Sequence, residues 1–330
     1  MPFRMKNTTT LTFTLMSFAT LENHKHEFFT LFFFLYIVTI FLNLLLISVI
    51  HRCNQLHQPM NIFACMLCFN EIYGSSALLL PVMSILLSKT HAISANMCFA
   101  QVYFLHTFGS SELCILALMG YDRYVAICSP LHYHTIMTPS MIYKLIAVVG
   151  LYPLIVFGSF FSLTLRLSFC GTVIPKLYCV NMELVKNACS STTLISIVGL
   201  LLIGLLVCPQ LIMIVFSYVQ IFRVCKKLSK DSQVHALKTC VPHLCSVLNY
   251  SIGALFEVVQ TRFDMSHVAI EARIFLSMYF VIIPPIVNPL LYGLGTHLVR
   301  VQIIKLCILY KIIPSNISKR IIPNETFTTN

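Results

Sequence analysis

Long apolar runs alternate with short polar segments along most of the chain. Each run reaches the length of about 20 residues that an α-helix needs to cross the hydrocarbon core of a bilayer. The polar segments between the runs carry much of the lysine and arginine. The pattern therefore predicts seven membrane-spanning helices, at residues 28–50, 60–87, 97–128, 141–163, 194–222, 236–260 and 272–294.

These runs divide the chain into three parts. Residues 1–27 are predicted to form a polar tail, residues 28–294 a helical membrane domain, and residues 295–330 a second tail. The first apolar run is expected to act as the targeting signal, because the residues before it lack the pattern of a cleavable signal peptide. The predicted fold class is an all-α membrane protein, a bundle of seven transmembrane helices.

A short amphipathic helix is expected to follow the seventh span. Residues 297–311 alternate apolar positions with basic ones, which is typical of a helix that lies on a membrane surface. The basic positions are Arg300, Lys305 and Lys311. The alternative is a frayed tail that is only partly helical.

The composition supports a membrane protein. Of the 330 residues, 58% are hydrophobic and 10% are charged, whereas soluble domains carry about 25% charged residues. Such a chain cannot cover a water-facing surface. The net charge of +11 comes from basic residues between apolar runs, so anionic membrane lipid and a cytoplasmic partner explain it better than nucleic acid does.

The basic residues also predict an orientation. Lysine and arginine favour the cytoplasmic side of a membrane, and an odd number of spans places the two ends of a chain on opposite sides. With the N-terminus outside the cell, the inner segments hold most of the basic residues. Asn7, in an Asn-Thr-Thr triplet, then becomes a candidate for extracellular glycosylation.

The cysteines fall into two groups. Most of the 14 lie inside apolar runs, where a thiol packs as a small hydrophobic group. Cys98 lies at the outer start of the third run, and Cys170, Cys179 and Cys189 lie between runs, all on the predicted extracellular side, where disulfides form. Four cysteines allow three connectivities, and the spacing alone does not choose among them.

A charged pair, Asp122-Arg123, lies at the predicted inner end of the third span. Charge is costly inside a bilayer, so such a pair is rare there and tends to be functional. The alternative is an interfacial pair whose arginine extends to the lipid headgroups. The position of the pair is compatible with both interpretations.

The residues around this pair carry a family resemblance. Residues 119–128 read Met-Gly-Tyr-Asp-Arg-Tyr-Val-Ala-Ile-Cys, and Pro-Leu-His-Tyr follows at residues 130–133. The seventh span contains Asn288-Pro289 with Tyr292 three residues later, and the first span contains Asn43. Together these motifs resemble the signature of vertebrate olfactory receptors, a branch of the rhodopsin-like receptors. Gly120, Lys238 and Pro242 depart from the residues usual in that family, which predicts a divergent branch.

The resemblance implies an odorant receptor of the plasma membrane that activates a stimulatory, olfactory-type heterotrimeric G protein. It also implies disulfides between Cys98 and Cys179 and between Cys170 and Cys189. The residues that it assigns to activation and G protein coupling are Asp122, Arg123, Tyr124, Asn288, Pro289 and Tyr292.

Two carboxylates are predicted inside the membrane. Glu71 and Glu112 each lie about 16 Å from the inner end of their own span, at 1.5 Å per residue. Two acids at one depth repel unless they share a proton or a cation. The resemblance implies a bound sodium ion, with no other cofactor. A proton or ion pathway, and a pair of protonated, hydrogen-bonded acids, are the alternatives.

A ligand pocket is predicted in the outer halves of the third, fifth, sixth and seventh spans. Arg262 lies one helical turn beyond Val258 and would cap an apolar chamber, which suits an amphiphilic anion. The alternative is that Arg262 extends to water or pairs with Asp264, Glu257 or Glu271. By the resemblance, the lining residues are Leu105, His106, Gly109, Ser110, Ala254, Val258 and Met278, to which the spacing adds Arg262.

No enzyme motif is present in the sequence. There is no Gly-x-Ser-x-Gly elbow, phosphate-binding glycine loop or His-Glu-x-x-His pair. The alternatives to an odorant receptor are therefore an ion- or proton-coupled transporter that uses Glu71 and Glu112, and a non-olfactory rhodopsin-like receptor.

Overall fold

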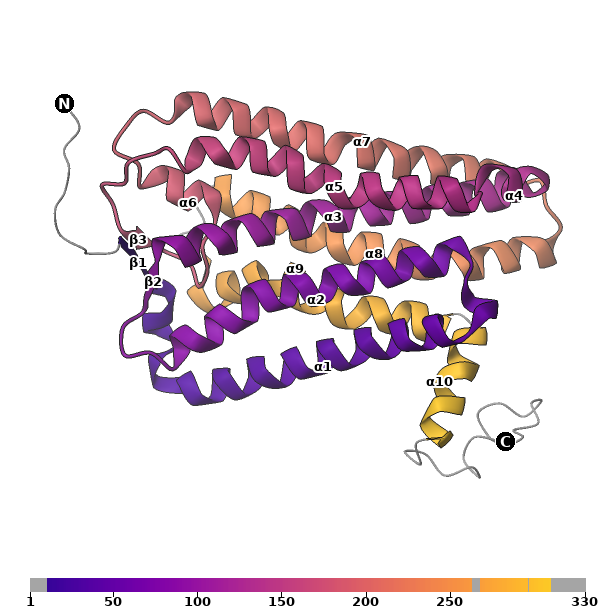
Figure 1. The fold of residues 1–330 in the computed structure, drawn as a ribbon, viewed down its shortest axis with the longest axis horizontal. Helices are drawn as coiled ribbons and strands as arrows, with labels where there is room; N and C mark the ends of the chain where they lie inside the picture. Colours follow the sequence, from indigo (N-terminus) through magenta and orange to yellow (C-terminus); the bar gives the residue numbers. More distant parts are fainter. Residues whose placement is uncertain (1–10, 263–267, 296, 310–330) are drawn as a thin grey trace.

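The computed structural model describes residues 11–262, 268–295 and 297–309. Within these residues, seven helices are long and apolar enough to cross a membrane. They run side by side along the long axis of the molecule (Figure 1), which confirms the predicted bundle. The seven helices are α1 Lys25–Arg52, α2 Pro59–Leu86, α3 Ala95–Cys128, α5 Pro139–Thr164, α7 Thr193–Cys225, α8 Lys230–Arg262 and α9 Ile270–Gly295.

Short elements gather at the two ends of the bundle (Figure 1). We call the end near Cys98 the disulfide end and the end near Arg123 the Asp-Arg end. The disulfide end carries β1 Thr12–Leu15, η1 Met16–Thr20, η2 Glu22–His24, β2 Ala92–Ser94, β3 Val173–Ile174 and α6 Asn181–Lys186. The Asp-Arg end carries η3 Asn54–Leu56, η4 Pro130–His132, α4 Tyr133–Ile136 and α10 His297–Leu309, the helix predicted after the seventh span.

Local sequence signals explain several helix starts. Pro59 and Pro139 occupy the first helical positions of α2 and α5. The backbone N–H that proline lacks would have no acceptor within the helix there. The Ser94 side chain accepts a hydrogen bond from the backbone N–H of Met97 at the start of α3 (3.4 Å). Helix α8 begins at Lys230, so most of the basic segment expected between the fifth and sixth spans is helical.

The N-terminal segment differs from the predicted polar tail. Residues 12–15 form β1, which pairs with β2 antiparallel, with Phe13 opposite Ile93, and with β3 in parallel. Phe13 and Leu15 are fully buried whereas Thr12 and Thr14 are exposed, so the strand has the two-residue alternation of a half-buried sheet. The prediction of a tail is therefore wrong for this stretch. Asn7 lies outside the described residues.

The core has two main hydrophobic clusters, one toward each end of the bundle. A layer of buried polar side chains lies between them, including Asn43, Glu71, Glu112 and Asn288. Helices α2 and α3 approach closely near this layer, because a Cβ at Gly74 would overlap the ring of Phe108. Any larger residue at position 74 would therefore force the Phe108 ring to shift.

Candidate functional site: the central cavity and the two ends of the bundle

A cavity of about 240 Å³ lies between α3, α7, α8, α9 and the loop that precedes α6. We call it the central cavity. Its wall includes five residues predicted to line a ligand pocket, Leu105, His106, Gly109, Ser110 and Ala254. The other lining residues are Leu113, Tyr178, Cys179, Val180, Met182, Ile203, Leu206, Val207, Tyr250, Glu257 and Phe280.

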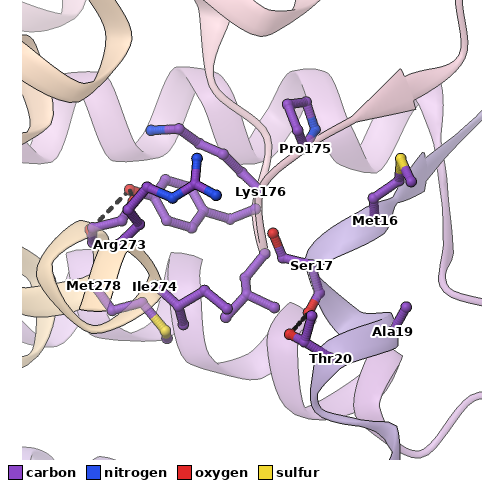
Figure 2. A pocket seen from close by; sticks show the side chains of 12 residues that line it. Met16, Ser17, Ala19, Thr20, Pro175, Lys176, Arg273, Ile274 and Met278 are labelled. Atoms are coloured by element: carbon purple, nitrogen blue, oxygen red, sulfur yellow. Dashed lines mark hydrogen bonds between the residues drawn. The ribbon is translucent and has the colours of Figure 1, made fainter. Parts of the chain in front are cut away.

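The remaining predicted lining residues are not on this wall. The side chains of Val258 and Arg262 lie outside the described part of the structure. Met278 lines a separate hollow of about 330 Å³, the end chamber, so its assignment to the central cavity is corrected. Figure 2 shows the end chamber between η1, the loop before Cys179 and the start of α9. It is lined by Met16, Ser17, Ala19, Thr20, Pro175, Lys176, Leu177, Tyr178, Arg273, Ile274, Ser277 and Met278.

The polar groups on α3 present hydrogen-bond acceptors to the central cavity. His106 Nδ1 donates to the Val102 carbonyl (2.9 Å), because a carbonyl can only accept. This leaves Nε2 of the neutral ring as an acceptor, while the ring stacks on Phe157 with centroids 4.6 Å apart. Ser110 Oγ donates to the His106 carbonyl (2.9 Å) and can still accept from a ligand.

A buried ion pair closes the cavity toward the disulfide end. Glu257 accepts from Lys176 Nζ (2.5 Å) and from Ser277 Oγ (3.0 Å). The Tyr178 hydroxyl donates to the Ser277 carbonyl (2.9 Å). Burial and the nearby Glu257 carboxylate hold the pKa of Tyr178 well above its usual range, so its hydroxyl keeps the proton. These bonds join the loop before α6 to α8 and α9.

Two disulfides hold the same end of the molecule. Cys98 at the start of α3 is bonded to Cys179, and Cys170 is bonded to Cys189. These are the pairings that the family resemblance implied. The backbone N–H of Cys179 also donates to Gln101 Oε1 (2.9 Å), which fixes the loop against α3. The loop residues that follow thus form part of the cavity wall.

In the polar layer, one side-chain amide, that of Asn288, bonds to both predicted membrane acids. Asn288 Nδ2 donates to Glu71 Oε1 (2.5 Å) and to Glu112 Oε1 (3.0 Å). Asn70 Nδ2 donates to Glu112 Oε2 (2.9 Å). Glu71 and Glu112 are fully buried. The cluster therefore connects α2, α3 and α9 at one point.

Two buried oxygens in this cluster test its fit to a cation. Glu71 Oε2 and Asn288 Oδ1 have no hydrogen-bond partner among the described residues. Hard cations prefer oxygen ligands, so carboxylate and amide oxygens fit a sodium ion. Within the described chain, no group of three or more His, Cys, Asp or Glu side chains could hold a metal. A sodium site would thus depend on two carboxylates, completed by an amide.

The proline in α9 has a specific partner on α1. Pro289 lacks an N–H, so the carbonyl of Pro285 one turn earlier has no helical donor. Asn43 Nδ2 donates to this carbonyl (2.8 Å) and to the Thr39 carbonyl of its own helix (2.8 Å). This bond therefore satisfies a buried acceptor that the helix itself cannot satisfy.

At the Asp-Arg end, Asp122 joins two groups. Arg123 donates to Asp122 Oδ2 from Nε (3.0 Å) and from Nη2 (2.5 Å), and the Tyr133 hydroxyl donates to Oδ1 (2.7 Å). Burial and the Asp122 carboxylate raise the pKa of Tyr133, so this phenol stays protonated and donates. Tyr124, the next residue on α3, packs its ring against Phe216 of α7.

A histidine joins three helices near the same end. His243 Nε2 of α8 donates to the Leu116 carbonyl of α3 (2.8 Å). Its Nδ1 must then accept from the Tyr218 hydroxyl of α7 (2.6 Å). We call this set the α3–α7–α8 tie.

Comparison with known proteins decides the family. The family model for olfactory receptors matches residues 32–310. Olfactory receptor 52D1 of Homo sapiens is 36% identical over 275 residues, which cover 82% of this chain and 86% of that protein. Olfactory receptor 51G1 of Homo sapiens is 34% identical over 297 residues, 89% of this chain and 92% of that protein. The chain belongs to the olfactory receptor family.

Several groups in this olfactory receptor were not predicted from its sequence. The Lys176–Glu257 pair joins positions 81 residues apart, and Tyr218 and His243 were not assigned to a contact. One signal was present for Lys176. It lies three residues before Cys179, and the implied bond of Cys179 to Cys98 draws that part of the loop over the bundle.

Proposed function

We propose that this protein is an odorant receptor that binds a small molecule in the central cavity and activates a stimulatory heterotrimeric G protein. The disulfide end faces the outside of the cell, and the Asp-Arg end faces the cytoplasm. The observation that carries the proposal is one helix with two attachments. Helix α8 lines the central cavity with Ala254 and Glu257, and it joins the α3–α7–α8 tie through His243.

These two attachments are close enough for direct coupling. Ala254 and His243 are about 16 Å apart along the helix axis at 1.5 Å per residue. A ligand that shifts α8 at the cavity therefore acts on a rigid rod whose other end is held by hydrogen bonds. Such a bond contributes about 1 kcal/mol, so a modest difference in ligand affinity between two states can change their populations.

The chemistry of the central cavity favours a neutral odorant. Its wall is mostly apolar, and its polar groups are acceptors together with the Glu257 carboxylate. A hydroxyl group can donate to His106 Nε2 or Ser110 Oγ, whereas the lining offers no lysine or arginine to pair with an anion. The anionic ligand predicted from Arg262 stays a prediction, to be tested with Arg262→Gln on acids and their methyl esters.

A cyclic-AMP reporter in cells that express the full chain tests the function. An odorant panel of matched alcohols, acids and esters should yield at least one concentration-dependent agonist, with neutral hydroxyl compounds most potent. His106→Phe should weaken the response to an alcohol about tenfold, because one hydrogen bond contributes about 1 kcal/mol or slightly more. Arg52→Gln, at the opposite end of the molecule, is a control for general effects of substitution.

Arg123→Ala separates coupling from ligand binding. The variant should reach the cell surface and lose the ligand-driven cyclic-AMP signal, because Arg123 is proposed to contact the G protein once the Asp-Arg end opens. A normal signal from well-expressed Arg123→Ala would contradict the proposed coupling. Substrate or ion flux without nucleotide exchange on a G protein would instead support the transporter alternative.

The cluster of Glu71, Glu112 and Asn288 is proposed to hold one sodium ion. The oxygens without partners on Glu71 and Asn288 support this proposal, since a cation would satisfy both. A shared proton is the competing explanation, because it also removes the repulsion between the carboxylates. Sodium titration distinguishes the two.

A further inference from the structure

The end chamber differs from the central cavity in charge. Its lining includes two cationic side chains, Lys176 and Arg273, whereas the lining of the central cavity includes a carboxylate and no lysine or arginine. In Figure 2, Lys176 and Arg273 lie across the chamber from Met16 and Ser17. The two hollows therefore suit different ligands.

The two cations of the chamber are in different situations. Lys176 is paired with Glu257. The Nε of the Arg273 guanidinium is buried and has no hydrogen-bond partner among the described residues. A buried guanidinium N–H without an acceptor is costly. Because Arg273 lies on the wall of a hollow of about 330 Å³, an anionic ligand in that hollow could accept this hydrogen bond.

The rest of the wall defines the remainder of that ligand. Met16, Ile274 and Met278 provide apolar surface beside Arg273. A guanidinium binds a carboxylate through two parallel hydrogen bonds, which fixes both position and orientation. We propose that the end chamber is a second ligand site, which binds an amphiphilic carboxylate with its head on Arg273 and its alkyl chain against these three residues.

The floor of the chamber keeps this ligand out of the central cavity. Tyr178 lines both hollows and donates to the Ser277 carbonyl, while Ser277 Oγ donates to Glu257. A carboxylate that moved deeper would leave Lys176 and Arg273 for a lining without lysine or arginine. The chamber is therefore a separate site for acids, in addition to the proposed odorant site.

Photolabelling in the full-length receptor tests the proposal. A diazirine analogue of decanoic acid and its methyl ester are each cross-linked to receptor in phosphatidylcholine nanodiscs, and modified residues are mapped by mass spectrometry. The acid should label residues of the end chamber, such as Ile274 and Met278, about tenfold more than the ester does, because a charged hydrogen-bond pair contributes more than 1.4 kcal/mol.

Arginine variants identify the group responsible. Arg273→Gln should reduce labelling by the acid about tenfold, whereas Arg273→Lys should keep much of it. Arg166→Gln, at an exposed arginine that lines neither hollow, should have no effect. The comparison of acid with ester uses the unaltered receptor, so it decides the question even if Arg273→Gln fails to fold.

Three results would overturn the proposal. They are equal labelling by acid and ester, labelling by the acid at central-cavity residues such as Leu113 alone, and unchanged labelling of well-folded Arg273→Gln. The readout requires neither signalling nor a G protein. Acid labelling at the end chamber without any cyclic-AMP response would therefore leave this site standing while contradicting the proposed coupling.

Discussion

The two ends of the receptor are held together by different kinds of bond. At the disulfide end, two covalent bonds, a three-stranded sheet and the buried Lys176–Glu257 pair join the N-terminal segment and the loop before α6 to the bundle. At the Asp-Arg end, the described contacts between helices are packing and hydrogen bonds, such as those of Asp122 and His243. The cysteines described there, including Cys225 and Cys240, are free thiols.

This difference suits a receptor whose two ends do different work. A binding site gains affinity when its wall is already in place, because less ordering is required on binding. A switch needs contacts that can be broken and remade at a cost of a few kcal/mol. The disulfide end has the first property and the Asp-Arg end the second. The predictions below disturb each end in turn.

Breaking a disulfide should have the largest effect. The Cys98–Cys179 bond spans 81 residues and the Cys170–Cys189 bond spans 19. In the chain-entropy model, loss of the longer link costs about 4.5 kcal/mol and loss of the shorter one about 3 kcal/mol. Cys98→Ser should therefore abolish surface delivery, and Cys170→Ser should reduce it less.

Surface labelling of intact cells measures both variants, with Cys245→Ser, at an exposed thiol, as the control. Equal surface delivery of Cys98→Ser and the unaltered receptor would show that the covalent link does not stabilise the disulfide end.

Removal of the buried ammonium should have the next largest effect. Lys176→Met leaves Glu257 without the Lys176 charge in a largely buried site, which should cost about 3 kcal/mol. Lys25→Met is the matched control, because Lys25 pairs with Glu22 at the surface, with the two side chains 32% and 45% exposed. That change should cost under about 1 kcal/mol. Thermal unfolding of the two purified variants compares the costs, and equal values would refute the structural role of the buried pair.

At the Asp-Arg end, Tyr133→Phe should have a smaller effect on stability. The variant loses one hydrogen bond to Asp122, while both bonds from Arg123 remain, so the cost should be about 1.5 kcal/mol. We propose that this contact holds the resting arrangement, so ligand-free cyclic AMP should rise. Tyr143→Phe, at an exposed tyrosine of α5, is the control. A fall in ligand-free signal with unchanged expression would assign Tyr133 to the active state instead.

The sequence predicted the long helices because each apolar run is long enough to cross a bilayer, and this signal is local. It failed for β1, because four residues with alternating burial resemble a polar tail until their partners β2 and β3 are known. The alternation of Thr12 to Leu15 was visible, but a strand of that length is stable only through pairing.

The site was predicted in part for a similar reason. Five lining residues came from matching positions on the two helices that most directly face the cavity, where helical spacing determines which side chains share a face. The Lys176–Glu257 pair depends on how a long loop folds over the bundle, and no spacing rule gives that contact. The acids Glu71 and Glu112 were placed at one depth from the rise per residue. Asn288, which bonds to both, was noted only as part of a motif.

The smallest expected effect is that of sodium on stability. It tests whether Glu71 and Glu112, in the middle of the bundle, bind a sodium ion. A ligand that binds only the folded state adds RT ln(1 + [L]/Kd) to stability, which is about 0.4 kcal/mol at a concentration equal to Kd. The unaltered receptor should therefore gain stability as sodium replaces choline at constant ionic strength. Glu112→Gln keeps the size of the side chain and removes its charge, so this gain should disappear. Glu183→Gln, which removes an acid outside the cluster, should retain it. If the unaltered receptor and Glu112→Gln show the same flat sodium titration, the two acids share a proton rather than a cation.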